Sequence, residues 1–131
     1  MKSEYELSFR DAPVIRTELP GPKSREILSR QEKYETSSRT YTKQFSMAIK
    51  DARGSTIQDV DGNIFIDWFS GICVLNLGHN HPEVKNAMME QLNKLVHINE
   101  VPTETRVEFL STLNSTLPQG LKDRWQYLIP R

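Results

Sequence analysis

The chain has 131 residues, about one domain, and its 17 Lys and Arg balance its 17 Asp and Glu to a net charge of zero. That balance argues against a nucleic-acid binder with a basic surface and against an acidic solvating tail. Only 37% of the residues are hydrophobic, whereas a self-contained domain of this size must bury roughly two-thirds of its unfolded surface. We therefore expect the chain to be part of a larger protein.

The first element in chain order is an irregular N-terminal arm over residues 1–23, where several Pro and Gly residues disfavour helix. Residues 24–36 are predicted to form a short surface helix, with Ser24 as its N-cap. Residues 37–54 are polar and mixed, and we expect an extended segment around residues 45–49.

The next predicted element is a β-hairpin. Asp61-Gly62 is a strong turn signal, because this type of turn needs a positive φ. It lies between residues 55–60 and 63–69, which are rich in Ile, Val, Phe and Trp. Ile64 and Ile66 recur with the period of two that is typical of a strand with one apolar face.

Two helices are predicted to follow the hairpin. The first begins at Pro82, and His97 would supply a favourable cation at its end. The second runs from about residue 103 to 117, with a competing start at Thr105, and a short strand follows at 125–129. The spacing of apolar residues predicts that the first helix buries one stripe: Val84, Ala87, Met88, Leu92, Leu95 and Val96.

No catalytic residue or metal site can be assembled from spacing alone. His79 and His81 flank Asn80, but no Cys or carboxylate has ligand spacing around them, so a structural turn into the following helix is favoured, with His81 near the N-cap. Asp59, Asp61 and Asp67 are close in sequence, and turn positions for two of them are favoured over a catalytic carboxylate pair. Phosphate-binding glycine motifs and the serine-hydrolase motif GxSxG are absent from the sequence.

The single cysteine and the hydropathy of the sequence indicate in which cellular compartment the protein is expected. One cysteine, Cys73, cannot form a disulfide within the chain and fits a reducing compartment, most simply as a small buried hydrophobe. The N-terminus lacks the apolar core of a signal peptide. The most apolar window, residues 64–77, is interrupted by polar residues and is shorter than the ~20 residues of a membrane span. We expect a cytoplasmic protein with no membrane or nucleic-acid partner.

Two motifs resemble a known family. Residues 59–67 read DVDGNIFID, and residues 78–82 read GHNHP. These runs resemble the N-terminal segment of the class III aminotransferases, which are fold type I enzymes dependent on pyridoxal 5'-phosphate. The resemblance extends from about residue 21 to residue 123.

The resemblance implies a mixed α/β fold: an arm, a helix, a β-hairpin or meander, two helices and a terminal strand. Residues 1–23 would be the arm, 24–123 a partial small domain, and 124–131 the truncated start of the large cofactor-binding domain. Residues 69–77 are similar to the family's substrate-entry segment. Ile72 would then line the substrate pocket with Cys73 beside it, whereas without the family Ile72 could equally be an ordinary strand core residue.

The departures from the family concern the cofactor. The glycine-rich loop that holds the cofactor phosphate is missing, as are the Asp for the pyridinium nitrogen, the Schiff-base Lys and the Arg for the substrate carboxylate. The resemblance therefore implies a piece of a homodimeric enzyme. That enzyme would move an amino group from an amino donor, an ω-amino or diamino acid, to a 2-oxo acid. The chain alone is expected to be inactive.

Two alternatives remain open. One is a non-catalytic interaction module that binds an intact aminotransferase subunit. The other is a piece of a related racemase or aminomutase that uses the same cofactor.

Overall fold

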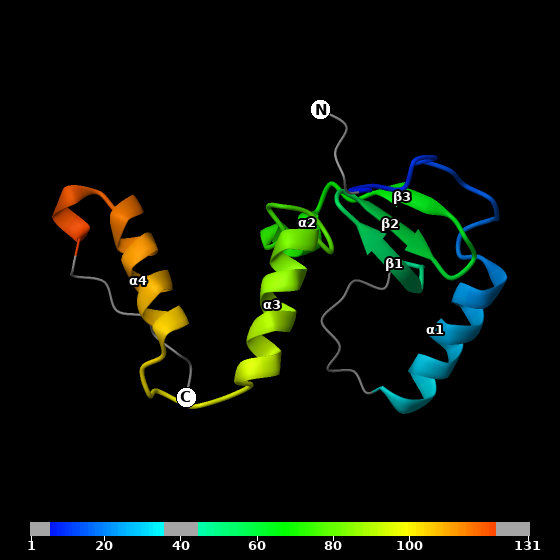
Figure 1. Ribbon diagram of the computed structural model, residues 1–131. Coiled ribbons are helices and arrows are strands. Elements are labelled where there is room, and N and C mark those ends of the chain that lie inside the picture. The colour runs from blue at the N-terminus through cyan, green and yellow to red at the C-terminus, as the bar shows by residue number, and fades with distance from the viewer. Residues whose placement is uncertain (1–5, 36–44, 123–131) are drawn as a thin grey trace. The chain divides into compact units, whose positions relative to one another are not determined.

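The computed structural model describes residues 6–35 and 45–122. The chain divides into two compact units, Met1–Leu92 and Asn93–Arg131. The first contains an antiparallel sheet with helices, so the predicted mixed α/β class is confirmed (Figure 1). The elements, in chain order, are α1 (Pro22–Tyr34), β1 (Ile49–Arg53), β2 (Thr56–Asp59), β3 (Ile64–Ile66), α2 (Ser70–Cys73), α3 (Pro82–Lys94), α4 (Glu104–Thr116) and the short 3-10 helix η1 (Gln119–Leu121).

The sheet has three strands in the order β1-β2-β3, with both pairs antiparallel. The N-terminal arm extends it, because Val14 and Ile64 exchange two backbone hydrogen bonds of 2.9 and 2.7 Å. At the other end, Gly54 in the β1–β2 turn pairs in the same way with His79. The sheet therefore connects the arm to the segment that follows β3. Strand β1 begins at Ile49, the last residue of the segment that was expected to be extended, and runs to Arg53.

The predicted hairpin turn between β2 and β3 is confirmed. The Gly62 N–H donates to the Asp59 carbonyl at 3.2 Å, and the Asp59 N–H donates to the Asn63 carbonyl at 3.0 Å. Gly62 has a φ of 89°, a conformation that glycine adopts without steric cost. Of the two strand residues expected to face inward, Ile64 is 4% exposed, but Ile66, at the end of the short strand, is 43% exposed.

A polar cluster lies behind this turn. Asp59 and Asn63 are fully buried, and Asn63 donates to Asp59 from its backbone N–H at 2.8 Å and from its amide Nδ2 at 2.7 Å. The amide oxygen of Asn63 accepts the backbone N–H groups of Arg16 and Thr17 at 2.6 and 3.0 Å. One side chain thus fixes both the hairpin turn and the arm. Ile64 is the one hydrophobic residue that is buried within the described part of the chain.

Helix α1 is capped by a residue from the hairpin. It begins at Pro22, and Gly21 at its N-cap position has no side chain to cap it. The carboxylate of Asp61 instead accepts the backbone N–H groups of Lys23 and Ser24, each at 2.8 Å. The prediction of a helix here was right, but the prediction that Ser24 is its cap was wrong. Ser24 lies inside the helix, is buried, and accepts the Ala48 N–H through its hydroxyl at 3.3 Å.

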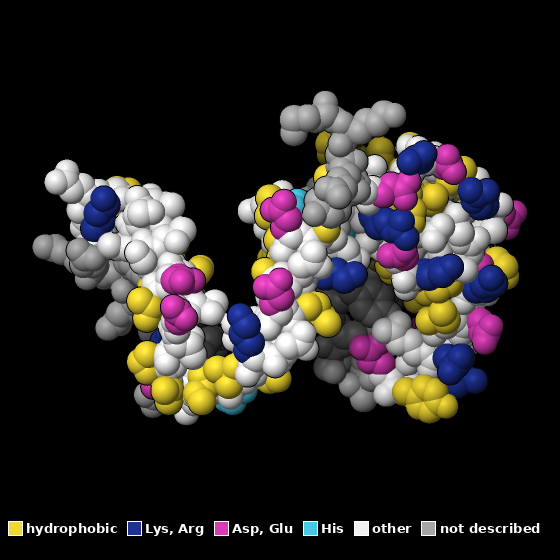
Figure 2. Space-filling view, viewed as in Figure 1, with side chains coloured by type: hydrophobic (Ala, Val, Ile, Leu, Met, Phe, Trp, Pro, Cys, Tyr) yellow, Lys and Arg dark blue, Asp and Glu magenta, His cyan; other side chains and the backbone are white. Residues whose placement is uncertain are grey.

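The predicted helix at Pro82 is confirmed as α3, and the carbonyl of His81 accepts the Lys85 N–H at 2.9 Å. Its predicted burial was wrong, because no residue of α3 is buried and its apolar side chains are open on the surface (Figure 2). Val84, Met88 and Leu92 are 43%, 61% and 49% exposed. The helix ends at Lys94, so the cation in its last turn is Lys94 and not His97.

In the second unit, α4 begins after Thr103, whose hydroxyl accepts the Arg106 N–H at 3.2 Å. The predicted helix is confirmed, and the competing start at Thr105 was wrong. It ends at Thr116, before Pro118. The strand expected at residues 125–129 lies outside the described residues. Within the described segments, none of the helices combines the length and hydrophobicity needed to span a bilayer.

Candidate functional site

The candidate site is the turn α2, which follows β3 and carries the two residues expected to bind substrate. Ser70, Gly71, Ile72 and Cys73 have φ values of 48°, 57°, 66° and 59°. Consecutive values in this range make α2 a left-handed turn. L-residues other than glycine lose about 1–2 kcal/mol each in this conformation. Since three of the four are not glycine, the surrounding structure must hold the turn in place.

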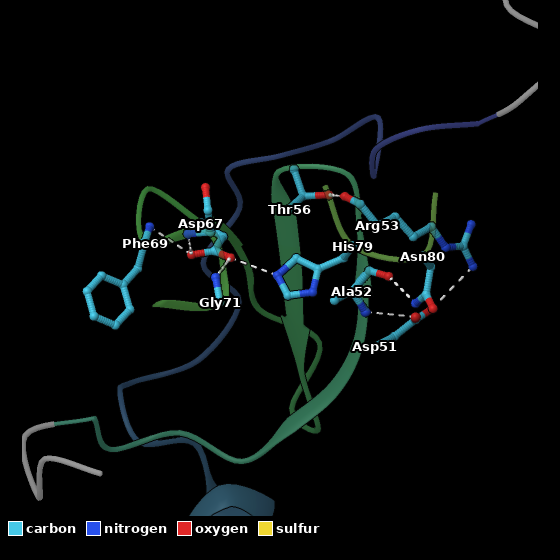
Figure 3. A network of polar contacts seen from close by, with 10 residues as sticks. Asp51, Ala52, Arg53, Thr56, Asp67, Phe69, Gly71, His79 and Asn80 are labelled. Atoms are coloured by element: carbon cyan, nitrogen blue, oxygen red, sulfur yellow. Dashed lines mark hydrogen bonds and ion pairs between the residues drawn. The ribbon is translucent and has the colours of Figure 1, made fainter. Parts of the chain in front are cut away.

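Asp67 caps this turn through its carboxylate (Figure 3). Its Oδ1 accepts the backbone N–H groups of Phe69 and Ser70 at 2.9 and 3.0 Å, and its Oδ2 accepts that of Gly71 at 3.2 Å. The other end of the turn is closed by the Cys73 N–H, which donates to the Phe69 carbonyl at 2.9 Å. One side chain therefore satisfies the N–H groups that the left-handed turn leaves free.

His79 connects Asp67 to the sheet. Its Nε2 lies 2.7 Å from Oδ2 of Asp67, and the two side chains are only 21% and 10% exposed. The His79 backbone pairs with Gly54 at 2.9 and 2.8 Å, and the Asp67 N–H donates to the Ser55 carbonyl at 2.8 Å. The β1–β2 turn thus anchors both members of the pair. His79 lies in the turn before α3, as its spacing indicated, and it links Asp67 to the sheet.

The environment of Asp67 lowers the pKa of its carboxyl group below the ordinary value of 3.8. Partial burial acts to raise the pKa. The hydrogen bond from His79 and the backbone N–H groups of Phe69 and Gly71 stabilise the carboxylate and outweigh that burial. The ionised form of Asp67 is therefore the one that the folded turn binds.

This shift predicts how the turn responds to acid. Because the pKa of Asp67 is lower in the folded than in the unfolded chain, its contribution to stability is complete above pH 3.8 and is lost as the pH falls through the folded value. Amide signals of residues 69–71, followed by NMR from pH 7 to pH 2.5, should hold to below pH 4 and then change together. In Asp67→Asn this transition should be absent.

The amide signals of residues 69–71 are followed, and not the stability of the whole chain, because the pKa of Asp61 is lowered as well. Burial acts to raise it, and the bonds from Ser24 and Lys23 at the start of α1 lower it by more. Loss of the Asp61 cap would affect the amides of α1 and not those of the turn. A transition of the turn signals centred at or above pH 3.8 would contradict the role given to Asp67.

The turn presents apolar side chains outward. Ile72 is 71% exposed, Val74 is 74% exposed, and Cys73 is exposed as well. The interpretation of Ile72 as an ordinary strand core residue is therefore wrong, as is that of Cys73 as a small buried residue. Their role in binding substrate stays a prediction.

Two hollows adjoin this segment. One, of about 390 Å³, is lined by Asp67, Ser70 and His79 together with the arm at Leu7 and Ser8. The other is an apolar groove of about 710 Å³ between residues 74–81 and α3, where Val84, Met88, Met89 and Leu92 form one wall. On the face shown in Figure 2, charges of both signs are interspersed over α1 and the sheet, so this face has no extended basic patch.

Sequence reasoning missed the function of Asp67, which it considered only as a possible catalytic carboxylate. The spacing Asp67-x-x-Ser70-Gly71 was the available signal, since an Asp just before a Ser-Gly pair can accept the N–H groups of a tight turn. It also missed Asn63, whose partners on the arm are too distant in sequence to be found from local patterns.

Comparison with known proteins gives a consistent result. A sequence model described as Aminotransferase class-III matches residues 36–128. The diaminobutyrate–2-oxoglutarate aminotransferase of Rhizobium meliloti is 39% identical over 98 residues, which are 73% of this chain and 21% of that protein. The alanine/serine racemase of Pyrococcus horikoshii is 34% identical over 92 residues, 70% of this chain and 19% of that protein.

A solved structure has the same fold over the matched part. The taurine:2-oxoglutarate aminotransferase of Bifidobacterium kashiwanohense, crystallised with PLP and glutamate, superposes with a TM-score of 0.61 and 26% identity. The match covers 70% of this chain and 21% of that one. The chain thus spans about a fifth of the length of these proteins.

Proposed function

The chain belongs to the class III aminotransferases, and from this premise we propose that it supplies the substrate-facing segment of a transaminase. The reaction would move an amino group from an ω-amino or diamino acid to a 2-oxo acid, in a cytoplasmic homodimer. The observation that carries the proposal is the left-handed turn held by Asp67, which directs the apolar side chain of Ile72 outward, where it is 71% exposed. Strained turns of this kind are concentrated at functional sites.

In this proposal Ile72 and Cys73 form part of the wall of the donor pocket. Apolar side chains shape such a pocket, and polar groups from elsewhere orient the ligand. Residues 24–123 would belong to the small domain after the arm at 1–23, and residues 124–131 would begin the large domain. The name of the Rhizobium meliloti relative favours a diamino acid as the donor and 2-oxoglutarate as the acceptor.

The family's cofactor does not fit the residues that the structure describes. Pyridoxal phosphate acts as an electron sink once it is bound to a Lys amine. Within residues 6–35 and 45–122 every Lys side chain is exposed. The converging backbone N–H groups of Phe69, Ser70 and Gly71, which could otherwise bind a phosphate, already donate to Asp67. We therefore assign this chain the shaping of the pocket and no step of the chemistry, and we expect no transaminase activity from it alone.

A chimera tests the proposal. The matching segment of the Rhizobium meliloti aminotransferase would be replaced by the corresponding residues of this chain, and diaminobutyrate–2-oxoglutarate transamination would be measured. Ile72→Ala should lower kcat/KM for the donor by about tenfold, since lost apolar contact in a pocket costs about 1–3 kcal/mol.

Ile27→Ala is the matched control. Ile27 lies on α1 and is 40% exposed, far in sequence from the turn. This variant should stay within about twofold of the unsubstituted chimera, as expected of surface changes. Equal effects of the two substitutions would contradict the assignment of Ile72 to the pocket.

The apolar groove beside α3 favours a second candidate, an interaction module that binds an intact aminotransferase subunit. Co-elution of the full chain with the Rhizobium meliloti enzyme at micromolar concentration would favour it, and separate elution would count against it. The similarity to the alanine/serine racemase of Pyrococcus horikoshii supports a further candidate, a piece of a racemase.

A further inference from the structure

We propose that Asp67 and His79 are positioning residues that set donor specificity by fixing where the turn α2 places Ile72, without touching the donor themselves. This inference rests on the proposed function, because it assigns a cause to the specificity of the same pocket. It begins from the observation that the turn is unfavourable by itself: Ser70, Ile72 and Cys73 all have positive φ values and none is glycine.

The Asp67 carboxylate is fully engaged in holding this turn. It accepts three backbone N–H groups, those of Phe69, Ser70 and Gly71, and the Nε2 of His79. Its side chain is only 10% exposed. A carboxylate with these four partners has little capacity left for a ligand, so its effect on the pocket must pass through the backbone that it holds.

His79 determines the orientation of that carboxylate. Its 2.7 Å contact with Oδ2 is the shortest that Asp67 makes among the bonds given above, and its own backbone is paired with Gly54 of the β1–β2 turn. Without His79, the carboxylate could rotate about its side-chain bonds and release the Gly71 N–H, which at 3.2 Å is the longest of the backbone contacts. The sheet thus fixes His79, His79 fixes Asp67, and Asp67 fixes the turn.

The position of the Ile72 side chain depends directly on the hydrogen bond between the Gly71 N–H and Asp67. Ile72 is the next residue, and its exposed side chain has few neighbours to hold it, so its position depends on the backbone of the turn. Relaxation of the turn should therefore move the pocket wall while β3 and the rest of the sheet stay in place. We expect a change in which donor is preferred, more than a general loss of rate.

The structural half of the test uses the full chain. The φ angles of residues 70–73 would be measured by NMR scalar couplings and intraresidue NOEs in Asp67→Ala, His79→Ala and His79→Gln. Asp67→Ala and His79→Ala should lose the positive-φ signature at Ile72. His79→Gln should retain it, because the Gln amide N–H can reach the same carboxylate oxygen.

Asp51→Asn is the matched control for these variants. Asp51 lies on β1, where its carboxylate accepts the Ala52 N–H at 2.8 Å and pairs with Arg53 at 3.3 Å, so both of these partners lie on β1. It should leave the φ of Ile72 unchanged. Thermal unfolding of each variant separates loss of the turn from loss of the whole fold. An unchanged φ of Ile72 in both Asp67→Ala and His79→Ala would overturn the proposal.

The functional half uses the same chimera, with diaminobutyrate and a diamino acid one methylene longer as donors. His79→Ala should shift the ratio of the two kcat/KM values by about tenfold, the range that one methylene is worth in an apolar pocket. His79→Gln should restore the ratio to within about threefold of the unsubstituted chimera. A merely structural role for His79 would lower both kcat/KM values alike and leave the ratio unchanged, which would overturn the proposal.

Failure of the two ideas can be told apart. A chimera in which Ile72→Ala is silent would overturn the proposed function, and the positioning role would fall with it. A chimera that responds to Ile72→Ala but keeps the same donor ratio in both Asp67→Ala and His79→Ala would overturn the positioning role alone.

Discussion

Replacement of Asn63 by Ala is expected to lower the free energy of unfolding by about 3 kcal/mol. The substitution removes the amide that donates to the buried Asp59 carboxylate at 2.7 Å and that accepts the Arg16 and Thr17 N–H groups. A buried polar group without its partner costs about 1–3 kcal/mol, and a charged one costs more. The arm should detach from the hairpin as a consequence.

Urea denaturation of the full chain, followed by circular dichroism, measures the loss of stability, and amide exchange at Val14 and Ile64 reports on the arm. Asn86→Ala is the control, because Asn86 is exposed on α3 and its replacement should change stability by no more than about 0.5 kcal/mol. If Asn63→Ala were as mild as this control, the buried amide could not be what fixes the arm.

The elements that local chemistry determines could be predicted from the sequence. The turn at Asp61-Gly62 was found because its signal lies within the turn itself, and the start of α3 was found from Pro82. The start of α4 was placed at about residue 103 by its apolar spacing, although the capping-box spacing pointed to Thr105. The cap of α1 was not found. Asp61 is separated from Lys23 by 38 positions, so no local pattern links the carboxylate to the N–H groups that it accepts.

Burial could not be predicted in the same way. The spacing of Val84, Met88 and Leu92 correctly indicated a helix with an apolar face, but spacing does not say what covers that face. The low hydrophobic content was the better guide to burial. Within the described segments it corresponds to one buried apolar residue, Ile64, and to polar side chains such as Asn63 and Asp59 in place of a larger apolar core.

The form of the candidate site could not be predicted from the sequence, and the role of its residues stays a prediction. The resemblance led to Ile72 and Cys73, whereas nothing in the sequence indicated a left-handed turn with three non-glycine residues. Such a turn contradicts local propensity, and it persists because Asp67 and His79 hold it through contacts that span 12 positions. Places where local preference fails in this way are expected at functional sites.

Replacement of Gly78 by Ala is expected to destabilise the candidate site by about 3 kcal/mol, through backbone strain and overpacking together. Gly78 has a φ of 86°, and an added Cβ would lie 2.6 Å from the Cα of Gly54. That contact is with backbone, so no side-chain rotation relieves it. The chain must separate at this point, which would break the Gly54–His79 pair and withdraw His79 from Asp67.

The expected result is therefore a loss of stability together with the loss of a particular contact. Urea denaturation measures the first, and the imidazole signals of His79 and the amide exchange of Gly54 report the second. Gly120→Ala is the matched control, because a Cβ added at Gly120 meets nothing within 4 Å. It should stay within about 0.5 kcal/mol of the unsubstituted chain. If Gly78→Ala left the His79 signals unchanged, the close approach of the two glycines could not be what holds His79 against Asp67.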